Sequence, residues 1–369
     1  MRQSIAIVFN GLCRKSGGLL LVLAAAALTY ALTSAAEAKP QNGAFITFDI
    51  PGGALDTFVN GINPAGVIAG TYVTETGVNL GFLRALNGSV ITISVPGSTA
   101  TFVGSGGPIG PNAGPPINPA GVTTGSYADV GGVMHGFVRA HDGAFATFDA
   151  PNSVNGTDFL CCITPEGAVA GISFDANFVG HGFLRAPNGT FAAFDPPAFT
   201  FTAPNGINPS GVITGAYFDA TGVEHGFLRG GDGTVITFDA PGAVNGTGSA
   251  GINPPGAIVG SFFDSKFVSH GFLRALDGTF TTFDAPGAAA PFGTTPIAIN
   301  PAGTTAGGYY DGVVFFHGFL RARDGTFTTV DPPGSAATFV GGINPAGVVA
   351  GDYFDATSGA AHGFIFLPH

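Results

Sequence analysis

The stretch HGFLRALDGTFTTFDAPG, which runs from His270 to Gly287, recurs with variations along most of the chain. Its opening H-G-F occurs six times, and a seventh copy has Leu in place of His; these copies begin at Leu80, His135, His181, His225, His270, His317 and His362. Successive copies lie 55, 46, 44, 45, 47 and 45 residues apart. Self-similarity at such a period is typical of repeat architectures.

Two further elements recur with the same period, and degenerate copies bring each of them to seven. I-N-P is followed by a small or polar residue and Gly, as at Ile343, and F-D-x-P follows a threonine-rich stretch, as at Phe283. Each unit therefore contains four short strands, A to D, joined by tight turns, which is typical of a β-propeller blade. The sequence predicts an all-β protein with almost no helix, in which residues 39–369 form a single seven-bladed propeller.

The two ends of the repeat region predict how the ring closes. A lone strand D occupies residues 44–49, whereas the last unit has strands A, B and C but no D. Seven copies of every strand exist only if the N-terminal strand completes the last blade. This closure would remove the open sheet edges that favour aggregation.

Residues 1–38 have the features of a secretory signal peptide. Arg2, Arg14 and Lys15 precede an apolar run over residues 19–36, and Ala-Glu-Ala at 36–38 provides the small residues of a cleavage site. An uncleaved membrane anchor is the alternative, although the run is short for a span. The predicted protein is secreted, extracellular or periplasmic, and not inserted in a membrane after cleavage.

The charge of the chain excludes some partners. After cleavage at residue 38, 9 basic and 22 acidic residues would give a net charge of −13. Nucleic acids and anionic membranes are bound through Lys and Arg, so neither is expected as a partner. No cofactor or metal motif is present in the sequence, and a monomer is expected.

Register places each repeated histidine beside an aspartate. A three-residue hairpin loop would pair Ala275 with Thr279, so His270 would lie opposite Asp284. The same arithmetic pairs His135 with Asp149, His181 with Asp195, His225 with Asp239, His317 with Asp331 and, at the ring closure, His362 with Asp49.

Strand B of most units ends in a second aspartate, six or seven residues before the histidine. The first unit lacks all three groups, having Leu80, Ser94 and Thr74 instead, which indicates that the groups are in contact. Histidine beside carboxylate could be catalytic, but no serine or cysteine recurs nearby, and histidines on different blades cannot share a zinc ion. We interpret them as a structural network buried between blades, and assign a similar role to the recurring arginines.

The pattern G-I-N-x-x-G-x-[VI]-x-G-x-[YF]-x-D-x-x-G-x-x-H-G-F-L resembles the HAF-repeat family of extracellular bacterial repeat proteins. The resemblance covers about residues 43–369. The chain departs from the family pattern in having Gly for Ala after the histidine, and Arg where Trp often follows the leucine. The resemblance implies secretion and a repeat β fold, and transfers no catalytic residues.

Two alternatives remain open for function. The favoured one is a secreted, non-catalytic propeller whose variable D–A and B–C loops bind a protein, peptide or glycan; the other is a hydrolase or lyase acting on a polysaccharide or ester at the channel mouth. The longest loop is expected at residues 96–116. The unusual polar residues expected on the loop face, and hence the candidate ligand contacts, are Asp56, Glu75, Asp158, Glu224 and Lys266.

Two adjacent cysteines remain in the sequence after the predicted signal peptide. Cys161 and Cys162 are expected to pack as small residues on an inner strand, where other units have Gly. A vicinal disulfide is the alternative in an oxidising compartment.

Overall fold

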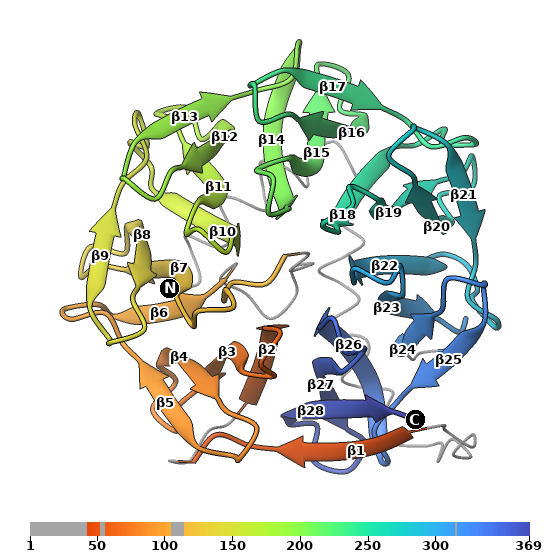
Figure 1. The fold of residues 1–369 in the computed structure, drawn as a ribbon, viewed down its shortest axis with the longest axis horizontal. Coiled ribbons are helices and arrows are strands. Elements are labelled where there is room, and N and C mark those ends of the chain that lie inside the picture. The colour runs from red at the N-terminus through yellow and green to blue at the C-terminus, as the bar shows by residue number, and fades with distance from the viewer. Residues whose placement is uncertain (1–42, 52–55, 105–113, 314–315) are drawn as a thin grey trace.

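Seven four-stranded antiparallel sheets surround a central axis in the computed structural model of the protein, which describes residues 43–51, 56–104, 114–313 and 316–369 (Figure 1). The described residues form strands, turns and loops, with no helix among them. The predicted seven-bladed propeller is confirmed. The signal peptide predicted over residues 1–38 lies outside the described residues.

The blades follow one another along the chain, each with its first strand nearest the axis (Figure 1). Blades 1 to 3 contain β2 (Asp56–Ile62), β3 (Ile68–Val73), β4 (Asn79–Arg84) and β5 (Val90–Ile93); β6 (Ala100–Val103), β7 (Thr123–Ala128), β8 (Met134–Arg139) and β9 (Phe145–Phe148); and β10 (Thr157–Ile163), β11 (Val169–Phe174), β12 (Gly180–Arg185) and β13 (Phe191–Phe194). Blades 4 to 6 contain β14 (Phe199–Ile207), β15 (Ile213–Asp219), β16 (Glu224–Arg229) and β17 (Val235–Phe238); β18 (Thr247–Ile252), β19 (Ile258–Phe263), β20 (Ser269–Arg274) and β21 (Phe280–Phe283); and β22 (Thr294–Ile299), β23 (Thr305–Tyr310), β24 (Phe316–Arg321) and β25 (Phe327–Val330).

Blade 7 joins the two ends of the described chain. It contains β26 (Ser335–Ile343), β27 (Val349–Asp355) and β28 (Ala361–Pro368), and β1 (Gly43–Phe48) adds the outermost strand by pairing with β28 (Figure 1). The register runs from Gly43 opposite Pro368 to Phe48 opposite Gly363. The predicted closure by the N-terminal strand is therefore present.

The asparagine of the I-N-P element links neighbouring blades. In blade 1, Oδ1 of Asn63 accepts a hydrogen bond from the Val67 amide and closes the A–B turn, while Nδ2 donates to the Asn118 carbonyl of blade 2 at 3.1 Å. Asn118 bonds in the same way to blade 3, and Asn253 and Asn300 to the next blades. These buried amides satisfy their donors and acceptors while fixing the spacing of the blades.

The H-G-F and F-D-x-P elements supply the core between blades. The phenylalanine of H-G-F is buried in all seven blades: Phe82, Phe137, Phe183, Phe227, Phe272, Phe319 and Phe364. In five of the seven blades an arginine two residues later stacks on the strand-D phenylalanine of the preceding blade; Arg84 lies 4.4 Å from the ring centroid of Phe48 across the seam. Arg185, Arg229, Arg274 and Arg321 repeat this contact at 4.6–5.1 Å. The interblade role inferred for the arginines is thus visible as cation–π stacking.

The expectation of a long D–A loop over residues 96–116 is wrong. β6 forms strand A of blade 2 inside this range, and the extra residues follow it as an insertion before Ile117 resumes contact with Thr123. The C-terminal end of the insertion lies at the central channel, where the Pro115 carbonyl accepts a hydrogen bond from the Ile163 amide of blade 3. Sequence reasoning missed this because a strand of only four residues between glycines resembles a loop.

Candidate functional site

The two ends of the ring differ in what they display. We call the end formed by the D–A connections and B–C turns the loop face, and the end formed by the A–B and C–D turns the turn face. Every repeated histidine is the second residue of a strand C, next to the end of strand B and the end of strand D, so all six lie on the loop face.

Each histidine bonds to the strand-D aspartate that the hairpin register predicts. Gly271 pairs with Phe283 and Arg274 with Phe280, which sets His270 opposite Asp284. Nδ1 of the six histidines lies 2.6–3.0 Å from the partner carboxylate. The seam pair of His362 and Asp49 joins residues separated by 313 positions at 2.6 Å.

A second carboxylate faces the other ring nitrogen in blades 2 to 6. Nε2 lies 3.4–3.7 Å from the aspartate that ends strand B, for example Asp219 beside His225. The Oδ1 atom of Asp219 also accepts the amides of Thr221 and Val223, and thereby holds the B–C turn. The hydrogen bond from the Thr221 hydroxyl, followed by those from the two amides, lowers the pKa of Asp219 to about 2.

The network differs from the expectation in its burial. The histidine side chains are 22–29% exposed, and each pair connects strands of one blade rather than two blades. Tyr217 and Tyr309 cover one face of the neighbouring imidazole with ring centroids 5.2 and 4.9 Å apart. Burial acts to lower the pKa of His317, but hydrogen bonds and charges of Asp331 and Asp311 outweigh it and raise that pKa.

The geometry matches a hydrogen-bonded support of the turns better than a reaction centre. The described residues hold no group of three or more His, Cys, Asp or Glu side chains placed to bind a metal ion. Each imidazole already contacts its carboxylate, and the same arrangement is repeated around the ring. The structural role assigned to the histidines stays a prediction that stability measurements can test.

We expect the seam pair to be energetically coupled. Replacing His362 by Leu and Asp49 by Ser, the residues that blade 1 carries at Leu80 and Ser94, should reduce the free energy of unfolding less together than the two single changes summed. Asp49 is 59% and His362 26% exposed, so water can partly replace the lost partner and either single change should cost about 0.2–1 kcal/mol. Urea unfolding of the four proteins measures the coupling. Strict additivity would show that the histidines do not act as structural partners of the aspartates.

The five candidate ligand residues do not converge on one site. Glu75 and Lys266 lie exposed in B–C turns, whereas the other three face blade interfaces. Oδ1 of Asp56 accepts the Ala361 amide across the seam at 3.0 Å, and Oδ1 of Asp158 accepts the Ser126 hydroxyl of blade 2 at 2.6 Å. Burial raises the pKa of Asp158, although these bonds from Ser126 and the Phe159 amide act to lower it.

Glu224 begins strand C of blade 4 and lies half-buried against the inner strand of blade 5. A Cβ atom at Gly248 would meet its Oε1 at 2.9 Å, which shows how closely the carboxyl group approaches that backbone. Poor hydration at this interface raises the pKa of Glu224 to about 7, against a smaller opposing effect of His225.

Asp352 is an acid that sequence reasoning missed. It lies on β27 with 6% of its surface exposed, and Oδ1 accepts the Val59 amide of blade 1 at 3.0 Å. Burial raises the pKa of Asp352 to about 7, with the Val59 bond acting in the opposite direction. A signal was available, since the equivalent strand-B positions hold Thr71, Ser126, Ile172, Ala216, Ser261 and Gly308 and no other acid.

Exposed apolar side chains gather on the loop face. Eight of the thirteen exposed large hydrophobic residues among the described ones lie in its B–C and D–A connections: Val78, Val130, Val133, Val154, Phe178, Val244, Phe267 and Val313. Only Leu86 and Leu276 lie in connections of the turn face. Exposed apolar side chains grouped on one face mark an interaction surface more often than scattered ones do.

Two of these residues adopt a backbone conformation that disfavours them. Phe178 and Phe267 have φ of 60°, and each donates its amide to the carbonyl three residues earlier in the B–C turn. Gly77, Gly132 and Gly222 occupy the same position in other blades. A left-handed conformation is unfavourable for a side-chain-bearing residue by about 1–2 kcal/mol, yet these phenylalanines are 51% and 63% exposed. Neither burial nor backbone geometry explains them.

Charge is segregated between the two faces. Sixteen acidic residues of the described chain lie at the loop face, with Lys266 as the one basic residue there: Asp49, Asp56, Glu75, Asp129, Asp149, Asp158, Asp175, Asp195, Asp219, Glu224, Asp239, Asp264, Asp284, Asp311, Asp331 and Asp355. The turn face carries seven arginines with five acids: Arg84, Arg139, Arg185, Arg229, Arg274, Arg321 and Arg323, with Asp142, Glu166, Asp232, Asp277 and Asp324.

A pocket opens on the loop face of blade 5 beside His270. Its apolar side is formed by Phe262 and the Pro241-Gly242 connection, and its polar side by Asp264 and Asp284. The pocket therefore presents carboxylates next to an aromatic ring.

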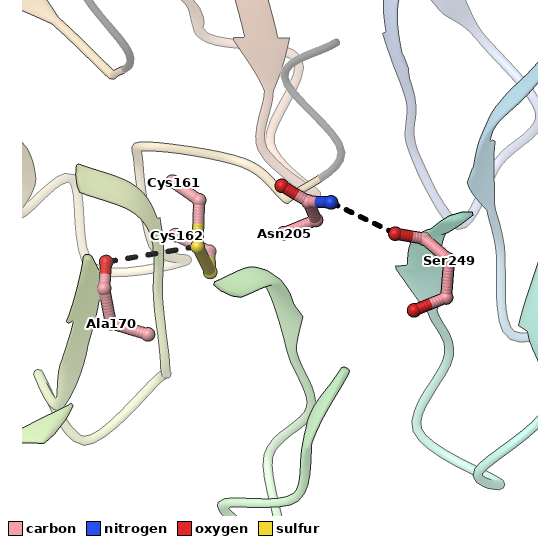
Figure 2. The surroundings of a disulfide bond; sticks show 5 residues. All are labelled: Cys161, Cys162, Ala170, Asn205 and Ser249. Carbon is pink, nitrogen blue, oxygen red and sulfur yellow. Dashed lines mark hydrogen bonds between the residues drawn. A yellow bond between two sulfur atoms is a disulfide. The ribbon is translucent and has the colours of Figure 1, made fainter. Parts of the chain in front are cut away.

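The two adjacent cysteines form a disulfide on β10, so the expectation that they remain free packing residues is wrong (Figure 2). The strand register shifts between Asp158 and Cys162, and Phe159 has φ of 48°. A regular strand points adjacent side chains to opposite faces; this bulge lets them meet. Both cysteines are also buried, and Cys161 Sγ lies 3.7 Å from the Ala170 carbonyl oxygen (Figure 2).

In the described part of the chain, no helix has the length and hydropathy needed to cross a membrane. No family model matches the chain, and no curated protein matches its sequence. Similarity to the HAF-repeat family therefore stays a prediction.

Solved structures of other propellers share the fold at low sequence identity. A catalytically inactive virginiamycin B lyase from Staphylococcus aureus with quinupristin is 12% identical, with a TM-score of 0.58, covering 88% of this chain and 99% of that one. The β-propeller domain of the Trilobed protease from Pyrococcus furiosus, described as having an open velcro topology, is 9% identical, with a TM-score of 0.58, covering 84% and 95%. A puromycin hydrolase variant is 11% identical, with a TM-score of 0.58, covering 88% and 56%. Such identities show that this chain has a β-propeller fold and nothing finer.

Proposed function

We propose that this protein is a secreted, non-catalytic β-propeller that binds a ligand through its loop face. The observation that carries the proposal is the pair of exposed phenylalanines, Phe178 and Phe267, held at left-handed positions where other blades have glycine. Residues that stabilise neither the core nor the turn are best explained by contact with another molecule. The rigid ring behind the turns would keep such contacts pre-organised.

The phenylalanines give the sharpest test of this proposal. Changing Phe178 and Phe267 together to Gly should leave the melting temperature unchanged or higher, because it removes two unfavourable left-handed conformations. Binding to a panel of immobilised glycans and cell-surface proteins, measured by interferometry, should fall by at least roughly tenfold for the true ligand.

Leu276 provides a matched control on the opposite end of the ring. It is 76% exposed in the C–D turn of blade 5, and Leu276→Ser removes apolar surface from the turn face. This variant should bind as the parent does. Equal loss of binding in both variants would show that the loop face is not the binding surface.

One observation supports the second candidate, a propeller hydrolase or lyase acting on a polysaccharide or ester. Glu224, with its pKa raised to about 7, could give or take a proton near neutral pH. Its carboxyl group faces the Gly248 backbone, however, and Asp158 and Asp352 face other blade interfaces. Turnover of a polysaccharide or ester that Glu224→Gln abolishes would favour the enzyme.

Secretion is part of the same proposal. The basic, apolar and Ala-Glu-Ala segments of residues 1–38 support it, and so does the resemblance to the extracellular HAF-repeat family. The expected location is extracellular or periplasmic, and the expected partner is an extracellular protein or glycan bound by a monomer.

A further inference from the structure

We propose that the ligand of the loop face is a basic polypeptide segment that also carries apolar side chains, an inference that rests on the proposed function above. Two independent features of the same surface lead to this partner. One is the segregation of charge between the faces, and the other is the set of apolar side chains among the acids.

The negative charge of the loop face favours a cationic partner. Asp56, Asp158 and Glu224 face blade interfaces, which leaves thirteen acids and one lysine to set the charge of the loop face. Such a surface attracts cations and repels anionic surfaces such as acidic proteins and anionic lipids. The seven arginines lie at the turn face, so they do not offset this field locally. Acidic side chains alone would be explained equally well by solubility. The exposed apolar residues beside them are the feature that indicates a ligand.

Apolar contact and charge meet in blade 5. Phe267 protrudes from the B–C turn that begins at Asp264, and Asp264 also lines the pocket beside His270 together with Phe262 and Asp284. A lysine or arginine side chain has an apolar stem and a cationic head. Phe262 is buried under the His270 ring, so the stem would pack on the exposed Pro241-Gly242 connection. The head would reach Asp264 and Asp284, which already contact His270. Neutral glycans would also donate hydroxyl hydrogen bonds to these carboxylates but would leave their negative charge unneutralised.

Synthetic peptides test the inference with the mature full-length protein. Three labelled peptides of equal length are compared by fluorescence anisotropy, one built of Lys and Leu, one of Glu and Leu, and one of Lys and Ser. The Lys/Leu peptide should bind, the Glu/Leu peptide should not, and the Lys/Ser peptide should bind at least roughly tenfold more weakly. Raising the ionic strength from about 0.05 to about 0.5 M should weaken the Lys/Leu complex.

Matched variants on the two faces of blade 5 distinguish specific binding at the loop face from general electrostatic attraction between peptide and protein. Phe267→Gly should weaken Lys/Leu binding roughly tenfold, and Leu276→Ser on the turn face should not. Asp264→Asn keeps the acceptor of the Lys266 and Val268 amides but removes the charge, and Asp277→Asn does the same for the Thr279 amide in the C–D turn. Only Asp264→Asn should weaken binding, by roughly threefold or more.

Some outcomes would contradict the basic partner but not the proposed binding function of the loop face, and others would contradict both. Equal effects of Asp264→Asn and Asp277→Asn would mean general charge attraction. Phe267-dependent binding to vesicles of phosphatidylcholine and phosphatidylglycerol would point to a lipid surface. Phe267-dependent binding to a glycan or to the Glu/Leu peptide would keep the loop face as a binding surface and remove the basic partner. Failure of every probe would contradict both proposals.

Discussion

A chain beginning at residue 52 should be about 2–4 kcal/mol less stable than one beginning at residue 39, because it loses β1. Phe45 packs on Phe364 and Phe366 with ring centroids 6.0 and 4.9 Å apart, and Phe48 contacts Phe82 of blade 1. Two half-buried phenylalanines contribute about 2–3 kcal/mol. Removing Asp49 takes away the partner of the partly exposed His362, at about 0.2–1 kcal/mol more. Urea unfolding followed by circular dichroism measures the difference.

The open ring should also expose the edge of β28, so the shortened chain should self-associate at concentrations where the longer chain does not. A synthetic peptide of residues 39–51 provides the control, since it should restore the denaturation midpoint when added in excess. An unchanged midpoint without the peptide would show that β1 does not hold the ring closed.

Asp352→Asn should raise the free energy of unfolding by about 3–4 kcal/mol at pH 8 and change it little at pH 4. The folded-state pKa of Asp352 is about 7, above the ordinary value of 3.8. The parent therefore has the full stability of the protonated group below about pH 4, and loses it as the pH rises toward 7. Asparagine removes this loss and retains an oxygen that can accept the Val59 amide. Thermal and urea unfolding between the two pH values measures the effect.

Asp219→Asn is a control of opposite sign. The folded-state pKa of Asp219 is lowered to about 2, so its carboxylate stabilises the protein above its ordinary pKa and loses this contribution as the pH falls through 2. The asparagine variant should consequently be less stable than the parent at pH 8. If Asp352→Asn also destabilised the protein at pH 8, its carboxyl group would have to be ionised and well paired in the folded state.

The histidine–aspartate pairs show what hairpin register alone can predict. Hairpins in this chain close through three residues ending in a left-handed glycine, such as Gly278, so the partner of every histidine could be counted from the turn. Their partial exposure could not be predicted in this way, because it depends on how neighbouring side chains and blades pack around each imidazole. The exposed Phe178 and Phe267 were visible in the sequence as departures from glycine, but only their φ and exposure mark them as a candidate binding pair.

The sequence by itself determined the number of blades, the four strands of each and the closure by the N-terminal strand, because these follow from repeat count, the two-residue period of strands and turn chemistry. Only the tertiary structure decided the position of the insertion after β6, the Cys161–Cys162 disulfide and the burial of Asp352. Each of these depends on a bulge or on contact with another blade, as in the bond between Asp352 and Val59, which are 293 residues apart. A repeat pattern describes what the blades share, whereas such contacts arise where single blades differ and the ring brings those differences together.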